Sequence, residues 1–220
     1  MSSLLTQFVN LLGALLLMLT FAMISQRRVV SLIHLFTLQG ATLVLATGLV
    51  GYVTGQPHLY LSAGLTLLLK VFLIPWLLHR VVNRLNIKWD VETLINIPTT
   101  MLIGIGVVIF AFNLALPIAS FSSALASGTL GIALACVLLS FLMMITRAKA
   151  VPQVIGFLAM ENGLFFAATA ATYGMPMVVE LGIALDVLIG ALILGVFMFQ
   201  IREQFDSLDI SHLEQLKEDQ

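Results

Sequence analysis

The sequence predicts an all-α integral membrane protein with about seven transmembrane helices and a parallel internal repeat. Of its 220 residues, 60% are hydrophobic and only 10% are charged, whereas soluble domains have about 25% charged residues. The mean hydropathy is +1.09. The apolar residues gather in runs of about 20, the length that a helix needs to cross the hydrocarbon core. This composition excludes a soluble globular domain, and the formal net charge of −1 does not indicate nucleic acid as a partner.

Seven segments are long and apolar enough to span a membrane, and short stretches such as "SQRR", "GQPH" and "TRAK" separate them. They cover roughly residues 4–25, 29–53, 58–82, 98–117, 124–146, 150–173 and 176–201. The first run lacks a basic n-region and a small-residue cleavage site, so it is interpreted as a span rather than a signal peptide. In the polar tail, "SHLE" fits a capping box, and the tail is either a short surface helix or a frayed terminus.

The basic residues predict the orientation of the chain. They follow the first, third, fifth and seventh spans, as Arg27, Arg28, Arg80, Arg84, Lys88, Arg147, Lys149, Arg202 and Lys217. The loops on the opposite side contain neither Lys nor Arg. Because basic loops remain in the cytoplasm, the N-terminus is predicted to lie outside and the C-terminus in the cytoplasm.

Two halves of the chain resemble each other. "ISQRRVVSLIHLFTLQGATLVL" and "ITRAKAVPQVIGFLAMENGLFF" both have a basic turn followed by an apolar helix with a central polar residue, Gln39 or Glu161. Further on, Lys70 in "LTLLLKVFLIPWLL" corresponds to Asp186 in "LGIALDVLIGALIL". Spans one to three would match spans five to seven, as a parallel repeat. The predicted division is 1–97 for the first repeat and its connector, 98–123 for the linking helix, 124–202 for the second repeat and 203–220 for the tail.

Four polar residues are predicted to lie at one depth, near the middle of their spans: Gln39, Lys70, Glu161 and Asp186. A charged residue at a helix centre costs at least about 2.5–3.5 kcal/mol. These side chains are therefore expected to face one another, water or a partner subunit. Pro75 cannot donate a hydrogen bond to the carbonyl of Val71, which predicts a free acceptor and a kink beside Lys70.

Two interpretations of these charges stay open. Lys70 and one carboxylate can form a static buried pair that holds helices together, although apolar replacements of such pairs are often neutral. Alternatively, removal from water disfavours the charged form of both groups, so that a carboxylate–lysine series with intervening water can pass protons. Glu180, near the outer end of span seven, is either interfacial or the outer mouth of such a path. His34 is either a relay on the cytoplasmic side or a packing residue.

The sequence shows no metal, haem or iron–sulfur motif, no phosphate-binding or dinucleotide fingerprint, and no nucleophile–histidine constellation. No catalytic residue and no resident cofactor are predicted in this chain.

The stretch from about 145 to 214 resembles the small K-type subunit of respiratory complex I, through "GFLAMENG" with Glu161 and "ELGIALDVLIG" with Asp186. The family has glutamate where Asp186 stands, and Gln39 replaces a carboxylate in the first half. Nearly the whole chain, including "LKVFLIP" with Lys70 and Pro75, is similar to the hydrogenase-4 component E family, membrane subunits of formate-hydrogenlyase-like group 4 [NiFe] hydrogenases.

This resemblance implies a multi-pass subunit of the cytoplasmic membrane of a prokaryote. Its implied partners are antiporter-like membrane subunits, a complex-I H-type membrane anchor and peripheral hydrogenase subunits, which would hold the nickel–iron centre and the iron–sulfur clusters. The implied role is proton translocation along a central polar axis, with Glu161 and Asp186 as carriers, Lys70 as relay, Glu180 and His34 as entrances, and Gln39 as a further residue of the path. The alternatives are a subunit of a multi-chain cation/proton antiporter and a purely structural or assembly subunit.

Overall fold

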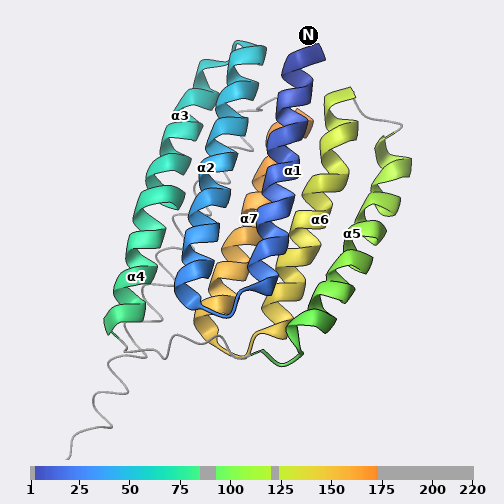
Figure 1. The fold of residues 1–220 in the computed structure, drawn as a ribbon. Helices are drawn as coiled ribbons and strands as arrows, with labels where there is room; N and C mark the ends of the chain where they lie inside the picture. Colours follow the sequence, from blue (N-terminus) through green and yellow to red (C-terminus); the bar gives the residue numbers. More distant parts are fainter. Residues whose placement is uncertain (1–2, 85–92, 120–123, 173–220) are drawn as a thin grey trace, which may run out of the picture.

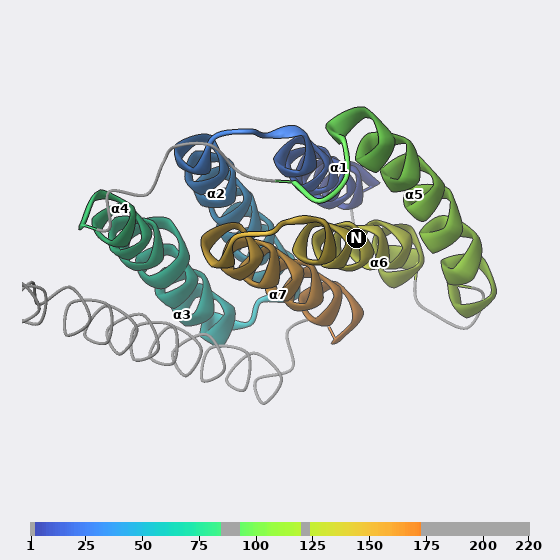
Figure 2. The same cartoon turned by 90° about the horizontal axis from the view of Figure 1, so that it is seen from below.

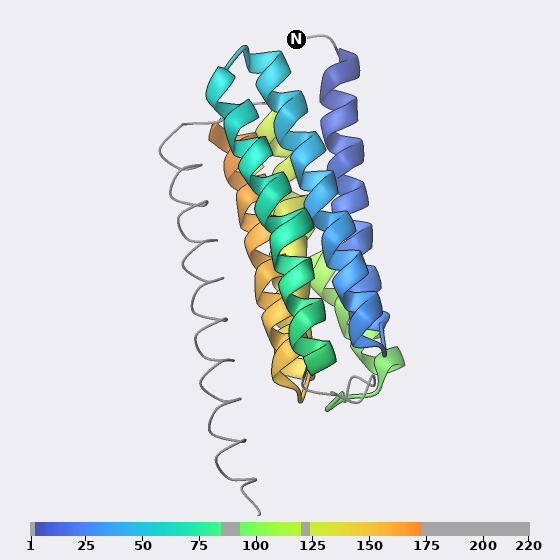
Figure 3. The same ribbon diagram turned by 90° about the vertical axis from the view of Figure 1, so that its left-hand side faces the viewer.

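The computed structural model describes residues 3–84, 93–119 and 124–172, and this part of the chain is all-helical (Figure 1). Its elements are α1 (Ser3–Ser25), α2 (Val29–Thr54), α3 (Pro57–Thr66), the π-helix η1 (Leu67–Leu73), α4 (Ile74–Arg84), α5 (Ile97–Ala119), α6 (Ala124–Thr146) and α7 (Ala150–Thr172). The segments α3, η1 and α4 follow one another without a break and form one continuous rod beside α2 (Figure 3). Six helical segments among these residues are long and apolar enough to cross a membrane. The chain is thus a multi-pass helical protein suited to a lipid bilayer.

The predicted spans agree closely with these helices. Each of the first six begins and ends within two residues of its prediction, and residues 124–146 match without any difference. The predicted seventh span, 176–201, and the polar tail lie outside the described residues. The count of seven and the repeat therefore stay predictions.

The helices form two layers in the view along their axes (Figure 2). One layer contains α2, α1 and α5, and the other contains the α3–α4 rod, α7 and α6. The most extensive packing joins α6 to α7, α5 to α6 and α1 to α2, and α7 also packs on α2. Helix α5 lies at the outer edge of the bundle, while α7 lies between its neighbours.

Successive spans run in opposite directions, with α3, η1 and α4 counted as one span (Figure 1), so the α1–α2 and α6–α7 turns and the C-terminal end of α4 lie at one end of the bundle. This end contains Arg27, Arg28, Arg147 and Lys149, and we call it the basic end. At the opposite end, Gly55 closes α2 with a φ of 67° and donates its backbone N–H to the carbonyl of Gly51. A left-handed glycine at this position is a common helix C-cap.

The described core divides into two apolar clusters. The basic-end cluster contains Met23, Ile24, Val29, Leu32, Ile33, Phe36, Ile74, Leu78, Val82, Leu139, Leu142, Met143, Val151, Ile155, Leu158 and Ala159. The opposite-end cluster contains Val9, Leu16, Leu43, Ala46, Val50, Leu59, Ile132, Ala133, Cys136, Phe165 and Phe166. The candidate site lies between them.

Candidate functional site: a buried polar layer

Five polar side chains from four spans lie between the two apolar clusters, and we call them the polar layer. They are Thr20, Gln39, Lys70, Glu161 and Asn162, each no more than 5% exposed. On α2, for example, Gln39 falls between Phe36 of the basic-end cluster and Leu43 of the opposite-end cluster. Because the same order recurs on the other spans, the polar groups form one level across the bundle. The predicted common depth of Gln39, Lys70 and Glu161 therefore corresponds to one connected region.

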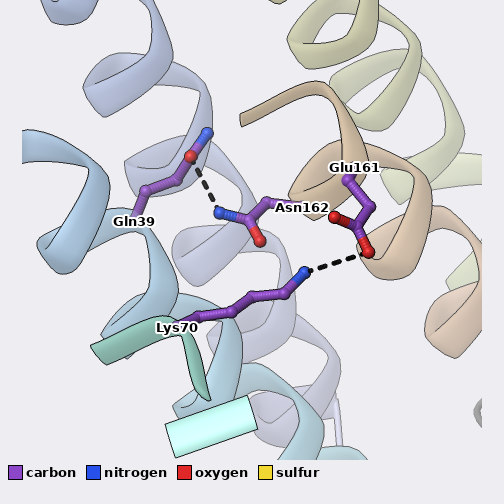
Figure 4. Close-up of polar contacts among 4 residues, drawn as sticks. All are labelled: Gln39, Lys70, Glu161 and Asn162. Carbon is purple, nitrogen blue, oxygen red and sulfur yellow. Dashed lines mark hydrogen bonds and ion pairs between the residues drawn. The ribbon is translucent and has the colours of Figure 1, made fainter. Parts of the chain in front are cut away.

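An oppositely charged pair forms the centre of the polar layer (Figure 4). Lys70 Nζ lies 3.7 Å from Glu161 Oε1 and 5.6 Å from the centroid of the Phe165 ring. The first distance is longer than a direct N–H···O hydrogen bond, but it is short enough for strong attraction away from water. Phe165 follows Glu161 by one helical turn, so both groups that attract the ammonium come from the same face of α7.

A directed chain of hydrogen bonds begins beside this pair, at Asn162, and extends towards α1. Asn162 Nδ2 donates to Gln39 Oε1 at 3.0 Å (Figure 4), and Gln39 Nε2 donates to Thr20 Oγ1 at 2.8 Å. Thr20 Oγ1 in turn donates to the carbonyl of Leu16 at 2.8 Å. Buried polar groups are costly unless they are bonded, and this chain satisfies several of them at once. It links α7, α2 and α1 at the level of the ion pair.

The backbone that presents Lys70 is a π-helix. The segment η1 (Leu67–Leu73) contains Lys70, and the N–H of Ile74 donates to the carbonyl of Leu69, five residues earlier. Pro75 follows directly; it has no N–H, and in a regular α-helix its ring would clash with the carbonyl of Val71. The predicted irregularity beside Lys70 is therefore present as a widened turn. Such turns occur frequently at functional sites.

Glycines bring the helices of the site close together. A Cβ on Gly40 of α2 would lie 3.3 Å from Lys70 Cβ, so α2 and η1 are in tight contact at the polar layer. On α7, a Cβ on Gly156 would lie 2.9 Å from Met144 Cγ, and one on Gly163 would lie 3.1 Å from Cys136 Cβ. At about 100° per residue, Glu161 projects roughly 140–160° away from this glycine face. Close packing on α6 thus turns the carboxylate towards η1.

The other predicted site residues are placed differently. His34 is exposed on α2, and its ring contacts that of His79 edge to face, with the centroids 5.6 Å apart. His79 Nδ1 lies 3.1 Å from the carbonyl oxygen of Pro75. No sequence pattern predicted this histidine pair, which is nearer to the basic end than the polar layer is. Glu180 and Asp186 lie outside the described residues.

Chemically, the polar layer offers an ammonium and a carboxylate that can hold a proton, and neutral amides that can orient them. Within residues 3–84, 93–119 and 124–172, no group of three or more His, Cys, Asp or Glu side chains is placed to hold a metal ion.

Arg147 has a role that sequence reasoning missed. It was predicted as a basic loop residue, but it is only 1% exposed. Its Nη2 donates to the carbonyls of Ile24 and Met23, at 2.5 and 3.3 Å. Burial lowers the pKa of this guanidinium. A cation that bonds the last carbonyls of a helix satisfies its C-terminus, so Arg147 joins the end of α1 to the α6–α7 turn. No local pattern indicated this contact, because 124 residues separate Arg147 from Met23.

Comparison with known proteins finds a relative in Mycobacterium tuberculosis (strain ATCC 25618 / H37Rv). The chain is 30% identical to the uncharacterized protein Rv0085 over 190 residues, which are 86% of each chain. The chain belongs to the same family as Rv0085. No family model matches it, and no solved structure matches it. The name of this relative states no activity, so function has to be inferred from the polar layer itself.

Proposed function

We propose that this protein is a non-catalytic membrane subunit of a complex-I-related, membrane-bound hydrogenase, in which Lys70 and Glu161 form part of a proton path. The observation that carries the proposal is the buried ion pair, held between two apolar clusters at the middle of the spans. Each such charge costs at least about 2.5–3.5 kcal/mol, a large share of the stability of a fold. A well-packed apolar pair would hold the helices together equally well. The two charges are therefore best explained by a role in proton transfer.

The pair couples two protonation sites. The carboxylate of Glu161 and the amino group of Lys70 can each bind and release a proton, and Lys70 Nζ lies 3.7 Å from Glu161 Oε1. The amides of Gln39 and Asn162 do not carry protons at neutral pH, so their role is to hold α2 and α7 in register. In this proposal Asp186 is the next carrier, Glu180 the outer mouth and His34 the cytoplasmic entrance.

The proposal includes seven spans, a parallel repeat, and an N-terminus outside the cytoplasmic membrane of a prokaryote. Two features of the described helices support the repeat. First, α1 packs on α6 and α2 packs on α7. Second, the two helices of each pair run in the same direction (Figure 1). A parallel repeat about an axis along the membrane normal brings equivalent helices together in this way. The bond between Gln39 and Asn162 lies at one of these contacts.

The partners in this proposal are antiporter-like subunits, a complex-I H-type anchor, and peripheral subunits that hold the nickel–iron and iron–sulfur centres. Purification of the tagged full-length chain from its native membrane in mild detergent tests this part. Nickel, iron and hydrogenase activity are expected to copurify with it. Recovery of antiporter-like subunits alone, with sodium-dependent proton exchange in vesicles without hydrogenase, would instead favour the antiporter alternative.

The proton path is tested in inside-out vesicles that contain the assembled complex, by comparing proton uptake per H₂ oxidised. Glu161→Gln is expected to reduce proton uptake at least tenfold while the complex stays assembled on a native gel. Glu161→Asp keeps a carboxylate and is expected to retain a measurable part of the uptake. Wild-type uptake by the double variant Lys70→Met/Glu161→Gln would overturn the proposal.

A structural role is the second candidate, and the contacts that the polar layer makes between helices favour it. The ion pair and the amide chain together join η1, α7, α2 and α1. Polar contacts of this kind stabilise the association of helices in a membrane. This candidate predicts that uncharged replacements of both residues keep the function of the complex. The same double variant therefore separates the two roles.

A further inference from the structure

An apolar groove of about 610 Å³ lies between α1 and α5, on the part of the bundle where α5 forms the outer edge (Figure 2). Its α1 wall runs from Ala14 to Ser25, and its α5 wall runs from Met101 to Phe112, with Ile132 of α6 at its floor. All of these lining side chains are apolar except Ser25. A surface of this kind suits hydrocarbon rather than a polar ligand.

The groove is open on the α1 side of α5, because α5 packs extensively on α6 but much less on α1. A Cβ on Gly104 would lie 3.1 Å from the Phe21 ring, and one on Gly131 would lie 2.8 Å from the Phe112 ring. These contacts fix α5 against α1 and α6. Away from them Ala14 and Ala22, both at the groove, are too short to reach across. Of the six described spans, α5 has the smallest buried share.

The length of the groove indicates what fits it. Ala14 and Ser25 are eleven residues apart on α1, which is about 16 Å along a helix. The hydrocarbon core is about 30 Å thick, so the groove covers about one leaflet. A transmembrane helix of a partner protein would need a groove of twice this length, whereas one lipid acyl chain matches it.

The charge at one end indicates the headgroup. The polar end of the groove, at Ser25, is at the basic end of the bundle, and the exposed residues Arg27 and Arg28 come two and three positions later in the chain. Two arginines at the level of the lipid headgroups attract anionic lipids. The opposite end of the groove, near Ala14, lies deep in the span, where the tip of a single-leaflet chain would end.

We propose that the α1–α5 groove is a binding site for an anionic phospholipid of the leaflet at the basic end, with one acyl chain in the groove and its phosphate on Arg27 and Arg28. This lipid fills the space that α5 leaves open, and it ties α5 to α1 at the edge of the bundle. The inference does not depend on the proposed proton path.

Native mass spectrometry of the purified full-length protein tests the site, with phosphatidylglycerol and phosphatidylcholine offered in equal amounts. One phosphatidylglycerol is expected to stay bound after delipidation, preferred about tenfold over phosphatidylcholine. The double variant Arg27→Gln/Arg28→Gln is expected to lose this preference, given the attraction of each arginine for an anionic leaflet. The charge-matched control Arg80→Gln/Lys149→Gln is expected to keep it. Equal retention of both lipids by the wild type would overturn the headgroup assignment.

Filling the groove tests the acyl chain. Ala14→Phe/Ala22→Phe is expected to reduce the retained phosphatidylglycerol at least tenfold, whereas Leu102→Phe, at an exposed position of α5 outside the groove lining, is expected to have no effect. Equal retention by the two variants would overturn the proposal. A photoreactive amino acid at Ile105, introduced in cells, identifies the natural occupant. A lipid adduct is expected, and a cross-link to a protein at this position would contradict it.

Discussion

At the scale of single residues, the ion pair between Lys70 and Glu161 is the feature with the largest energetic effect. Both charges are buried, so removal of one leaves the other without its counter-charge. Such a change typically costs 3–5 kcal/mol, whereas replacement of both partners is often neutral. The pair therefore predicts a strong coupling that depends on the presence of both charges.

We expect Lys70→Met and Glu161→Gln each to lower the free energy of unfolding by about 3 kcal/mol. The double variant should recover most of this loss, because no unpaired charge remains. The free energy of unfolding is measured in mixed micelles for the wild type, the two single variants and the double variant, which together form a double-mutant cycle. If the losses of the single variants simply add in the double variant, the two groups are not coupled and the ion pair has no energetic role.

The polar layer also shows what sequence can and cannot predict about single residues. A polar residue within an apolar run is easy to recognise, so the common level of Gln39, Lys70 and Glu161 was predictable, whereas Asp186, the fourth residue of that prediction, lies outside the described residues. The partners of these residues were not predictable in the same way. Helices that are apolar all round give little indication of their rotation about the axis, and this rotation decides that Asn162 and Thr20 bond Gln39. The burial of Arg147 was missed for a related reason, since a basic residue in a turn is normally solvated.

At the scale of elements, the close contact of α2 with η1 holds the site together. Gly40→Leu is expected to cost about 1–3 kcal/mol, because an extra side chain in a packed contact forces the backbone to shift. A Cβ at Gly40 would lie 3.3 Å from Lys70 Cβ and 3.5 Å from the Lys70 carbonyl oxygen. The variant should also reduce proton uptake, since η1 carries Lys70 away from Glu161.

Gly48 gives a matched control on the same helix, because a Cβ there would have no neighbour within 4 Å. Gly48→Leu is expected to change the free energy of unfolding by less than about 0.5 kcal/mol, as for other substitutions without packing contacts. Thermal unfolding of both variants in the same detergent makes the comparison. Equal destabilisation at the two positions would mean that helix flexibility, and not the contact with Lys70, is the cause.

The contact of Arg147 with the C-terminus of α1 gives a second prediction at this scale. Arg147 Nη2 bonds two carbonyls of this helix, and a hydrogen bond from a charged group contributes about 1.5–3 kcal/mol. Arg147→Gln is expected to lower the stability by at least this amount, whereas Arg28→Gln, at an exposed position, should have little effect. Thermal unfolding in detergent checks both. Similar midpoints for the two variants would show that the cap is not important.

The element boundaries were the most predictable part of the fold, since an apolar run of about 20 residues directly gives the length of a membrane helix. The π-helix was only partly predicted. Pro75 indicates that a helical hydrogen bond is lost, but a helix can accommodate a proline either by a kink or by a widened turn. The choice between them depends on packing against α2, which no local pattern in "LKVFLIP" encodes.

At the scale of the whole molecule, the separation of basic and neutral ends predicts the orientation in the membrane. The α6–α7 turn, at the basic end, is expected to face the cytoplasm, and the α2–α3 turn to face outside. In a background in which Cys136→Ala removes the natural thiol, Ala148→Cys and Gln56→Cys place one thiol at each end. A membrane-impermeant maleimide added to intact spheroplasts is expected to label Gln56→Cys only. Ala148→Cys should react only after permeabilisation, and the reverse pattern would show that the chain is inserted the other way round.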